Sequence, residues 1–421
     1  MDDLYRDIFI LESSIKDRFI IYSPLNGMSF FANTKAVGII NNYLNGQGIS
    51  SEYSKLCGNI QKISMMRKTI PEKRDFKNKN LYPVFLLSQK CNLACSYCYA
   101  QNARSQDILS KDKIKKIVEY FLVNFRNNVK KFSFIGGGEP TLTWDLFKWS
   151  VNYIQGAIQK QKLNIVLTTN ATLLNEERVL WLKQNDIYVF VSFDILPEIQ
   201  NKQRSFVDKN KYSFDVVDKN IKLLINNGFI PQIRSTITGA NVFLQQKMVQ
   251  FVIDNYPQIK AMNFEPVMDI QHNTAEFYES YLESFFEAER IGKLNGVTVY
   301  NPIIKRLDNT RTSYCPGEFC VTPTGKITAC HRVSSDLDRG FDEFCYGEVN
   351  DIVQINEKRA ENIFNAHNID GSVCSTCFAK WNCAGICTQK RSLLSDKQLL
   401  IECNFIKKLL TKKIENILLG I

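Results

Sequence analysis

Between residues 82 and 292 the chain alternates short apolar runs with amphipathic stretches of helical period. The apolar runs predict strands at Val84–Leu87, Phe132–Ile135, Ile165–Thr168, Ile187–Phe193, Ile230–Thr236 and Met262–Val267. The amphipathic stretches predict helices at 110–127, 144–160, 174–185, 213–227, 243–256 and 275–292. Six strands alternating with six helices predict an α/β fold with a parallel sheet. Periodicity alone leaves two architectures open, a doubly wound sheet and a barrel.

The cysteines form a second constraint, because they are clustered. Of thirteen in 421 residues, three stand at Cys91, Cys95 and Cys98, nine lie between Cys315 and Cys403, and one is isolated. A fraction of about 3% is far below that of a disulfide scaffold, and a chain of this length does not need disulfides to fold. Short spacings between cysteines therefore indicate metal ligation.

The first cluster, Cys91-x3-Cys95-x2-Cys98, directly follows the first strand of the series. It therefore lies at a strand's carboxyl end, where α/β folds place their active sites. Three thiolates can hold three irons of a [4Fe–4S] cluster and leave the fourth iron open to a substrate. Two alternatives are a zinc site completed by a distant residue and three unrelated buried thiols.

A glycine-rich segment, Gly136-Gly137-Gly138-Glu139-Pro140, stands at the end of the second strand. Glycines let a backbone approach a ligand closely, and Glu139 adds a carboxylate that can bind an ammonium group. Such a segment alone can also be an ordinary turn. Its position one βα unit after the cysteine cluster favours a ligand site.

The cysteine motif followed by Gly-Gly-Glu-Pro resembles the radical S-adenosylmethionine (radical SAM) superfamily. The resemblance implies a partial (β/α)6 barrel that resembles a TIM barrel over residues 81–296. It also implies that SAM binds the open iron and is cleaved to a 5′-deoxyadenosyl radical, which abstracts hydrogen from the substrate. Hard radical chemistry belongs to the cofactor, and the protein supplies orientation and shielding.

The resemblance also implies a set of SAM contacts. These would be made by Tyr97, Gly137, Gly138, Glu139, Ser192 and Arg204. The chain departs from the family pattern after Ser192-Phe-Asp194, with Ile195 in place of the usual Gly and Gln200 where His is common. The alternative for Arg204 is a solvated loop charge. Met268 could contact adenine or belong to the core.

The C-terminal cysteines form two interlocking patterns. The first is Cys315-x4-Cys320-x9-Cys330, and the second is Cys374-x2-Cys377-x5-Cys383-x3-Cys387, followed by Cys403. Pro323-Thr324-Gly325-Lys326 predicts a hairpin turn that sets Cys320 and Cys330 on adjacent strands. Cys374-x2-Cys377 alone would suit structural zinc.

The whole pattern resembles the SPASM domain of radical SAM enzymes, which holds two auxiliary [4Fe–4S] clusters, giving three clusters in all. By that resemblance Cys315, Cys320, Cys330 and Cys387 ligate the first auxiliary cluster, and Cys374, Cys377, Cys383 and Cys403 ligate the second. Cys57 and Cys345 remain as ordinary thiols, although Cys345 is near enough in sequence to substitute. Closed clusters suit electron transfer.

His331 follows Cys330, at a position where sulfatase-maturing relatives commonly carry an Asp that acts as a base. A histidine can accept a proton near neutral pH, so His331 is the candidate catalytic base. The alternative is a surface loop histidine.

The first 80 residues predict a small α/β unit. Strand-like runs flank Asn26-Gly27, which favours a type I′ hairpin, and a helix capped by Asn33 follows and ends at Gly46. The unit is similar to the RiPP recognition element (RRE), a module that binds a leader peptide by strand addition. Residues 66–80 are basic and predict a linker. The excess of basic over acidic residues in 1–80 would suit an acidic leader, and the alternative is a solvated basic linker.

The resulting organisation is a peptide-recognition unit and linker (1–80), a radical SAM core (81–296) and a SPASM domain (297–421). The expected function is a maturase that installs a carbon–carbon or thioether cross-link in a ribosomally made precursor peptide, using a flavodoxin- or ferredoxin-type reductant. The alternatives are a sulfatase-maturing enzyme, a peptide epimerase and a basic, zinc-stabilised nucleic-acid-binding protein. The absence of a secretory signal and of a long apolar run predicts a cytoplasmic protein without a membrane segment.

Overall fold

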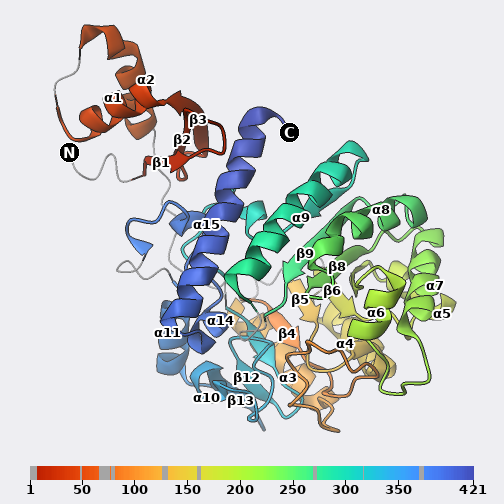
Figure 1. Cartoon of the computed structure of the whole chain (residues 1–421). Helices are drawn as coiled ribbons and strands as arrows, with labels where there is room; N and C mark the ends of the chain where they lie inside the picture. The colour runs from red at the N-terminus through yellow and green to blue at the C-terminus, as the bar shows by residue number, and fades with distance from the viewer. Residues whose placement is uncertain are drawn as a thin grey trace.

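Two β-sheets organise the computed structural model, a three-stranded sheet near the N-terminus and an eleven-stranded sheet (Figure 1). The structure describes residues 7–47, 50–65, 76, 81–125, 131–158, 163–268, 273–315, 317–368 and 374–421. Most of the predicted linker, residues 66–75 and 77–80, lies outside these ranges.

Seven strands of the larger sheet are parallel and lie in sequential order. They are β4 (Pro83–Phe85), β5 (Lys131–Phe134), β6 (Asn164–Thr169), β7 (Ile187–Ser192), β8 (Gln232–Ile237), β9 (Ala261–Pro266) and β10 (Thr298–Tyr300). A doubly wound sheet would reverse its order at a switch point, whereas sequential order is typical of a barrel. The structure therefore has the partial barrel.

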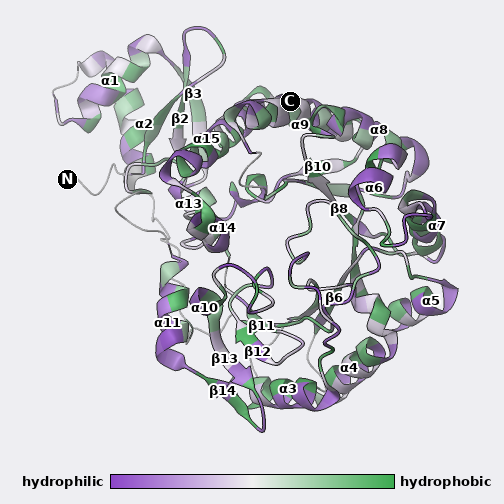
Figure 2. Ribbon diagram, turned by 60° about the horizontal axis from the view of Figure 1, so that its bottom comes forward, coloured by the Kyte–Doolittle hydropathy of each residue, from purple (hydrophilic) through white to green (hydrophobic). Residues whose placement is uncertain are grey.

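The connecting helices form a ring outside the strands (Figure 2). They are α3 (Lys111–Phe125), α4 (Trp144–Ala157), α5 (Glu176–Gln184), α6 (Pro197–Gln203), α7 (Ser213–Asn226), α8 (Gln245–Asn255) and α9 (Ala275–Leu294). The six predicted strands and six predicted helices are all present. Strand β10 and the short helix α6 are additional, and three-residue strands carry too little periodicity to be predicted.

The cysteine-rich region continues the same sheet. Strand β11 (Phe319–Val321) pairs in parallel with β4, and β12 (Lys326–Thr328), β13 (Cys345–Val349) and β14 (Val353–Ile355) follow as an antiparallel ladder. The turn before Lys326 is therefore the predicted hairpin, with Cys320 paired opposite Thr328. Cys330 was expected on the adjacent strand, but it lies two residues past the end of β12 because the strand stops at Thr328. The backbone ladder thus joins the predicted core to the region after residue 297.

In its described residues, the C-terminal region also contains five α-helices. They are α10 (Phe341–Phe344), α11 (Glu357–Ala366), α13 (Lys380–Cys383), α14 (Thr388–Leu393) and α15 (Asp396–Leu419). Of these, α11 contacts β13 and α15 contacts α9. Aromatic residues join α15 to the barrel, since the rings of Phe405 on α15 and Tyr278 on α9 lie 4.2 Å apart. Phe76, from the predicted linker, is buried against Tyr346 and Phe364.

The N-terminal unit consists of β1 (Phe9–Glu12), β2 (Arg18–Ser23), β3 (Met28–Asn33), α1 (Thr34–Leu44) and α2 (Ser54–Met65). The Asn33 side chain caps α1 by accepting from the amide of Ala36, as predicted. The type I′ turn is wrong, because four residues join the strands and only Gly27 has a positive φ, +62°. The amide of Gly27 instead donates to the carbonyl of Pro24.

This unit contacts the C-terminal region. The Glu415 carboxylate on α15 accepts hydrogen bonds from Ser13 and Ser14 at 2.6–2.7 Å. The hydroxyl of Tyr22 donates to Asn382 at 3.0 Å. Among the described helices, none is long and apolar enough to cross a membrane.

Candidate functional site

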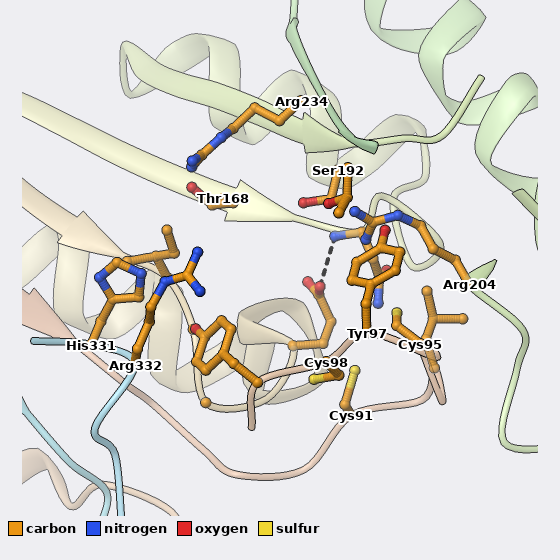
Figure 3. A pocket seen from close by; sticks show the side chains of 18 of the residues that line it. Cys91, Cys95, Tyr97, Cys98, Thr168, Ser192, Arg204, Arg234, His331 and Arg332 are labelled. Carbon is orange, nitrogen blue, oxygen red and sulfur yellow. Dashed lines mark hydrogen bonds between the residues drawn. The ribbon is translucent and has the colours of Figure 1, made fainter. Parts of the chain in front are cut away.

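A cavity of about 270 Å³ lies at the carboxyl ends of the barrel strands. The sequence suggested ten residues for contact with SAM, for ligation of the first cluster and for the catalytic base. All ten line this cavity (Figure 3). They are Cys91, Cys95, Tyr97, Cys98, Gly137, Gly138, Glu139, Ser192, Arg204 and His331. Met268 lines the same cavity, so it is not confined to the core.

The cysteine loop brings three thiols to one wall of this cavity. Burial raises the pKa of Cys91, and it raises the pKa of Cys95 to about 12. Buried thiols resist ionisation, whereas a bound metal cation favours the thiolate. Three such thiols in one loop are therefore a donor set that suits an iron–sulfur cluster with one iron left without a cysteine.

The glycine segment packs directly against the start of the cysteine loop. The amide of Gly138 donates to the carbonyl of Ser88 at 2.7 Å, and that of Glu139 donates to the carbonyl of Lys90 at 2.8 Å. A Cβ on Gly138 would stand 1.7 Å from the carbonyl oxygen of Lys90, which no side chain can tolerate. Glycine is required here because two backbones meet.

The Glu139 carboxylate is buried and held by four protein donors. Oε1 accepts from the amide of Thr141 and from the hydroxyls of Thr141 and Thr169, while Oε2 accepts from the amide of Asn170 at 2.8 Å. Burial nevertheless leaves its pKa raised. Oε2 has one protein donor, so this oxygen is the one suited to an ammonium group from the cavity.

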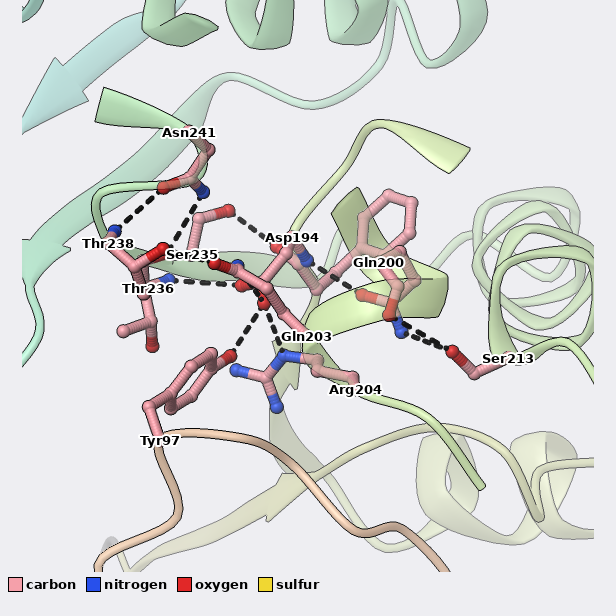
Figure 4. Close-up of polar contacts among 11 residues, drawn as sticks. Tyr97, Asp194, Gln200, Gln203, Arg204, Ser213, Ser235, Thr236, Thr238 and Asn241 are labelled. Carbon is pink, nitrogen blue, oxygen red and sulfur yellow. Dashed lines mark hydrogen bonds and ion pairs between the residues drawn. The ribbon is translucent and has the colours of Figure 1, made fainter. Parts of the chain in front are cut away.

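Asp194 organises the part of the site around Tyr97 and Arg204 (Figure 4). Its side chain is fully buried, and Oδ2 accepts from the Tyr97 hydroxyl at 2.6 Å and from Gln203 at 2.9 Å. The Arg204 Nε atom lies 3.1 Å from the same oxygen, and its guanidinium lies 5.3 Å from the centre of the Tyr97 ring. Burial is the largest single influence and would lower the pKa of Arg204, but the charges of Asp194, Tyr97 and Cys95 together raise it.

The departures from the family pattern have a structural role in this network. Gln200 accepts from the amide of Asp194 at 2.9 Å and donates to Ser213 at 3.2 Å. Ile195 adopts the left-handed backbone conformation, with φ +68°, which explains why glycine is common at this position. Gln200 and Ile195 therefore preserve the local geometry, and Arg204 is a buried cation, not a solvated loop charge.

His331 enters the cavity from the C-terminal region, across from Arg204 (Figure 3). Its backbone amide donates to Glu318 at 2.6 Å, and its Nδ1 lies 2.9 Å from both carboxylate oxygens. Burial opposes ionisation of Glu318, yet the charge of His331 and these hydrogen bonds lower its pKa. This pairing orients the ring and leaves Nε2 as the other proton-accepting position.

Four further cysteines line a separate pocket of about 310 Å³. They are Cys374, Cys377, Cys383 and Cys403. Apolar side chains share the pocket, including Ile386, Leu399 and Ile406, and burial raises the pKa of Cys383 to about 12. The four residues that resemblance grouped together are therefore neighbours in the structure.

Cys315, Cys320, Cys330 and Cys387 also lie near one another. Burial is the main cause of the raised pKa of Cys330, and the charges of Cys387 and Cys315 add to it. The charge of Cys330 in turn helps to raise the pKa of Cys320. The charges that shift the pKa of Cys345 come from Lys326, Arg359 and Asp342. None of them is a cysteine, so Cys345 stands apart from this set of four. None of the thirteen cysteines, all of them in described segments, forms a disulfide.

Three residues of the site were not identified from the sequence. Asp194 stands inside the Ser192-Phe-Asp194 motif, so that motif could have revealed it. Glu318 and Arg104 offered no such signal, because neither belongs to a recognisable motif. Arg104 donates to the carbonyl of Gly137 at 3.0 Å and to the Cys98 sulfur at 3.3 Å.

Comparison with known proteins identifies the domain that carries this cavity. Residues 85–251 match the Radical SAM superfamily. An uncharacterized protein of Methanocaldococcus jannaschii is 30% identical over 171 residues, 40% of this chain and 57% of that protein. The Fe-coproporphyrin III synthase of Methanosarcina barkeri is matched over 47% of its length. The chain thus spans about half the length of these two relatives.

Two further relatives are matched over more of this chain. A cysteine-type anaerobic sulfatase-maturating enzyme of Clostridium novyi is 25% identical over 58% of this chain and 71% of that protein. The subtilosin biosynthesis protein AlbA of Bacillus subtilis is 25% identical over 62% of this chain and 57% of that protein.

Two solved structures share the fold. The anSMEcpe enzyme with bound AdoMet has a TM-score of 0.68 at 19% identity, covering 81% of this chain and 99% of that one. Streptococcus suis SuiB bound to the precursor peptide SuiA has a TM-score of 0.50 at 14% identity, covering 91% and 94%. Residues 85–251 therefore form a radical SAM domain, which implies SAM and a [4Fe–4S] cluster.

Proposed function

We propose that this chain is a radical SAM maturase that installs a carbon–carbon or thioether cross-link in a ribosomally made precursor peptide. The observation that carries the proposal is the cavity in which Cys91, Cys95 and Cys98 meet Glu139 and Arg204. The AlbA relative, a bacteriocin biosynthesis protein, supports a peptide substrate, as does SuiB with its precursor.

In this proposal the chain's own residues hold SAM and its cluster. Cys91, Cys95 and Cys98 are the iron ligands, Glu139 binds the amino group of SAM, and Arg204, fixed by Asp194, faces its carboxylate. When bound, the clusters and SAM supply the radical that removes one hydrogen atom and the acceptor for the electron left behind. His331 accepts the proton that a cross-link must also release, with Glu318 fixing its ring.

The two remaining cysteine sets, one built around Cys315 and the other around Cys374, are proposed to hold the auxiliary clusters. Each set brings four thiols together, so each can ligate all four irons of a cubane. We therefore propose three clusters and about twelve irons per chain. A flavodoxin- or ferredoxin-type protein of a reducing cytoplasm is the proposed electron donor.

The proposed organisation keeps the three segments 1–80, 81–296 and 297–421. The N-terminal sheet has the order β1-β2-β3, so β1 and β3 are its edges, and we propose that one of them pairs with the leader. In a direct test, removing the leader from the substrate peptide should slow its modification by at least about tenfold. Equal rates with and without leader would contradict this role.

The central test is anaerobic reconstitution with SAM, dithionite and a small peptide encoded beside the gene, followed by mass spectrometry. Loss of two hydrogen atoms supports a cross-link. An unchanged mass in water, with uptake of one deuterium from heavy water, indicates epimerisation instead. Cys98→Ala serves as the control that lacks one ligand of the proposed SAM-binding cluster.

Sulfatase maturation is the second candidate, because the match covers 71% of the sulfatase-maturating relative and 57% of AlbA. This chain carries His331, paired with Glu318, at the position where Asp is common in that branch. A sulfatase-derived peptide containing Cys separates the two candidates. Its conversion to formylglycine would favour the second.

Zinc-stabilised nucleic-acid binding predicts a colourless protein with zinc and no iron. Among the described residues, no group of three His, Cys, Asp or Glu side chains is gathered as one metal ion requires. Metal analysis after anaerobic purification decides between the two, since the proposed enzyme is brown and contains iron.

A further inference from the structure

Arg104 joins the cysteine loop to the glycine segment, although neither motif contains it. One guanidinium nitrogen, Nη1, donates to the carbonyls of Gln89 at 3.1 Å and Gly137 at 3.0 Å. The other, Nη2, donates to the sulfur of Cys98 at 3.3 Å. A single side chain therefore contacts a proposed iron ligand and the backbone of the proposed SAM site.

The surroundings of Arg104 leave these three acceptors as its main partners. Among the described residues, no carboxylate lies within ion-pair distance of its guanidinium. Its positive charge lowers the pKa of Cys91, although burial dominates there. Arg104 also lines two spaces, the reaction cavity and an outer pocket of about 460 Å³ that also borders the cysteine loop.

Hydrogen bonds to the sulfurs of an iron–sulfur cluster stabilise its more negative, reduced form and so raise its reduction potential. An arginine is suited to this role because its fork fixes several donors at once, whereas a lysine is a single point charge. The bond to Gly137 adds a second effect, because a shift of the guanidinium would move the glycine segment together with Cys98.

We propose that Arg104 is a positioning residue that raises the reduction potential of the SAM-binding cluster through Cys98 and holds the glycine segment in register with it. This inference rests on the proposed function, since it requires that Cys91, Cys95 and Cys98 hold a cluster. The net free energy of one hydrogen bond corresponds to about a fivefold change in an equilibrium.

The test compares Arg104→Gln and Arg104→Lys with the wild-type holoenzyme, all reconstituted anaerobically. Electron paramagnetic resonance at controlled potential counts reduced SAM-binding clusters, which are recognised by the change in their signal when SAM is added. At the wild-type midpoint potential, Arg104→Gln should show a reduced-to-oxidised ratio at least about fivefold lower. Arg104→Lys keeps the charge and should recover only part of that loss.

Lys90→Gln is the matched control. Lys90 precedes Cys91 and lines the same outer pocket, so this variant removes one positive charge from the same loop. Lys90→Gln should lower the reduced-to-oxidised ratio of the SAM-binding cluster less than Arg104→Gln does. If Arg104→Gln folds and retains about eight auxiliary irons but loses the other four, the positioning role is also supported.

Two results would overturn the inference. One is a wild-type ratio in Arg104→Gln, and the other is full recovery in Arg104→Lys, which would assign the effect to charge alone. If Arg104→Gln does not fold, Arg104→Lys and Lys90→Gln still decide between these possibilities. A wild-type protein without a SAM-sensitive cluster would instead refute the proposed function.

Discussion

Two cysteine sites of this chain differ in what surrounds their thiols. The cavity at Cys91, Cys95 and Cys98 is lined by Glu139, Arg204 and other polar side chains. The pocket at Cys374, Cys377, Cys383 and Cys403 has four thiols and mainly apolar neighbours such as Leu399. The first offers one ligand fewer and many polar partners, whereas the second offers a complete set.

Under the proposed function, this difference separates a site for substrate chemistry from a site for electron transfer. A cluster with an open iron needs charged groups nearby to orient a molecule that binds there. A cluster with four thiolates needs only burial and insulation to store or pass an electron. The proposed function therefore places substrate chemistry in the barrel cavity and electron transfer in the C-terminal pocket.

The largest expected effect tests the cavity side of the comparison. Cys98→Ala should abolish formation of 5′-deoxyadenosine, because the cluster loses a ligand and SAM loses its reductant. Iron should fall from about twelve to about eight per chain. Chromatography of the reaction and an iron assay measure both. Retained SAM cleavage would break the assignment.

The matching change in the C-terminal pocket should separate two activities. In Cys374→Ala we expect a similar loss of about four irons, with SAM cleavage retained and peptide product lost. Deoxyadenosine and product are measured in the same reaction. Full product formation without the second auxiliary cluster would remove the electron-transfer role.

The next prediction tests the proposed base, His331. This residue belongs to the C-terminal region but lines the barrel cavity. His331→Ala should slow product formation by about a hundredfold while SAM cleavage continues, because general-base catalysis contributes on that order. Glu318→Gln should have a smaller effect in the same direction. The exposed Glu343 supplies the control, Glu343→Gln, and equal product yields in all three would exclude this base.

Asp194→Asn tests the polar wall that distinguishes the cavity. It leaves the buried Arg204 without its carboxylate, which costs about 3 kcal/mol of unfolding free energy. We expect the Kd for SAM to rise by about tenfold, as measured by equilibrium dialysis. Asp208→Asn, at an exposed position nearby, should leave the Kd unchanged. An unaltered Kd in Asp194→Asn would show that this wall is dispensable.

The smallest expected effect concerns the contact between α15 and the N-terminal unit, away from the barrel cavity. Glu415 has a pKa lowered to about 2, because hydrogen bonds from Lys412, Ser13 and Ser14 outweigh burial. Its contribution to stability is thus present above about pH 4.5 and is lost only between pH 4.5 and 2. At pH 7, Glu415→Gln should weaken docking of the N-terminal unit by about 1–2 kcal/mol.

Hydrogen exchange of residues 7–23 measures this change. The reaction cavity should be unaffected, so SAM cleavage is the internal control. Unchanged exchange would mean that other contacts, such as that of Tyr22 with Asn382, hold the unit in place.

Local features of the sequence predicted much of the molecule. Six barrel strands, six helices, the Asn33 cap and the hairpin before Lys326 follow from periodicity and turn chemistry within short windows. The type I′ turn was wrong because Asn-Gly at a four-residue loop places only the glycine at positive φ. Local preference there was overruled by the length of the loop.

The sequence by itself determined the cysteine spacings, and the family resemblance that they carry implied which thiols would share a cluster. Only the tertiary structure decided that Asp194 binds Tyr97 and Arg204, that Glu318 holds His331, and that Arg104 reaches Cys98. Motif spacing is set by bonds along the chain, whereas these pairs form because separate strands and loops pack together. The local sequence sets the chemistry of each residue, but the tertiary fold determines which partner it contacts.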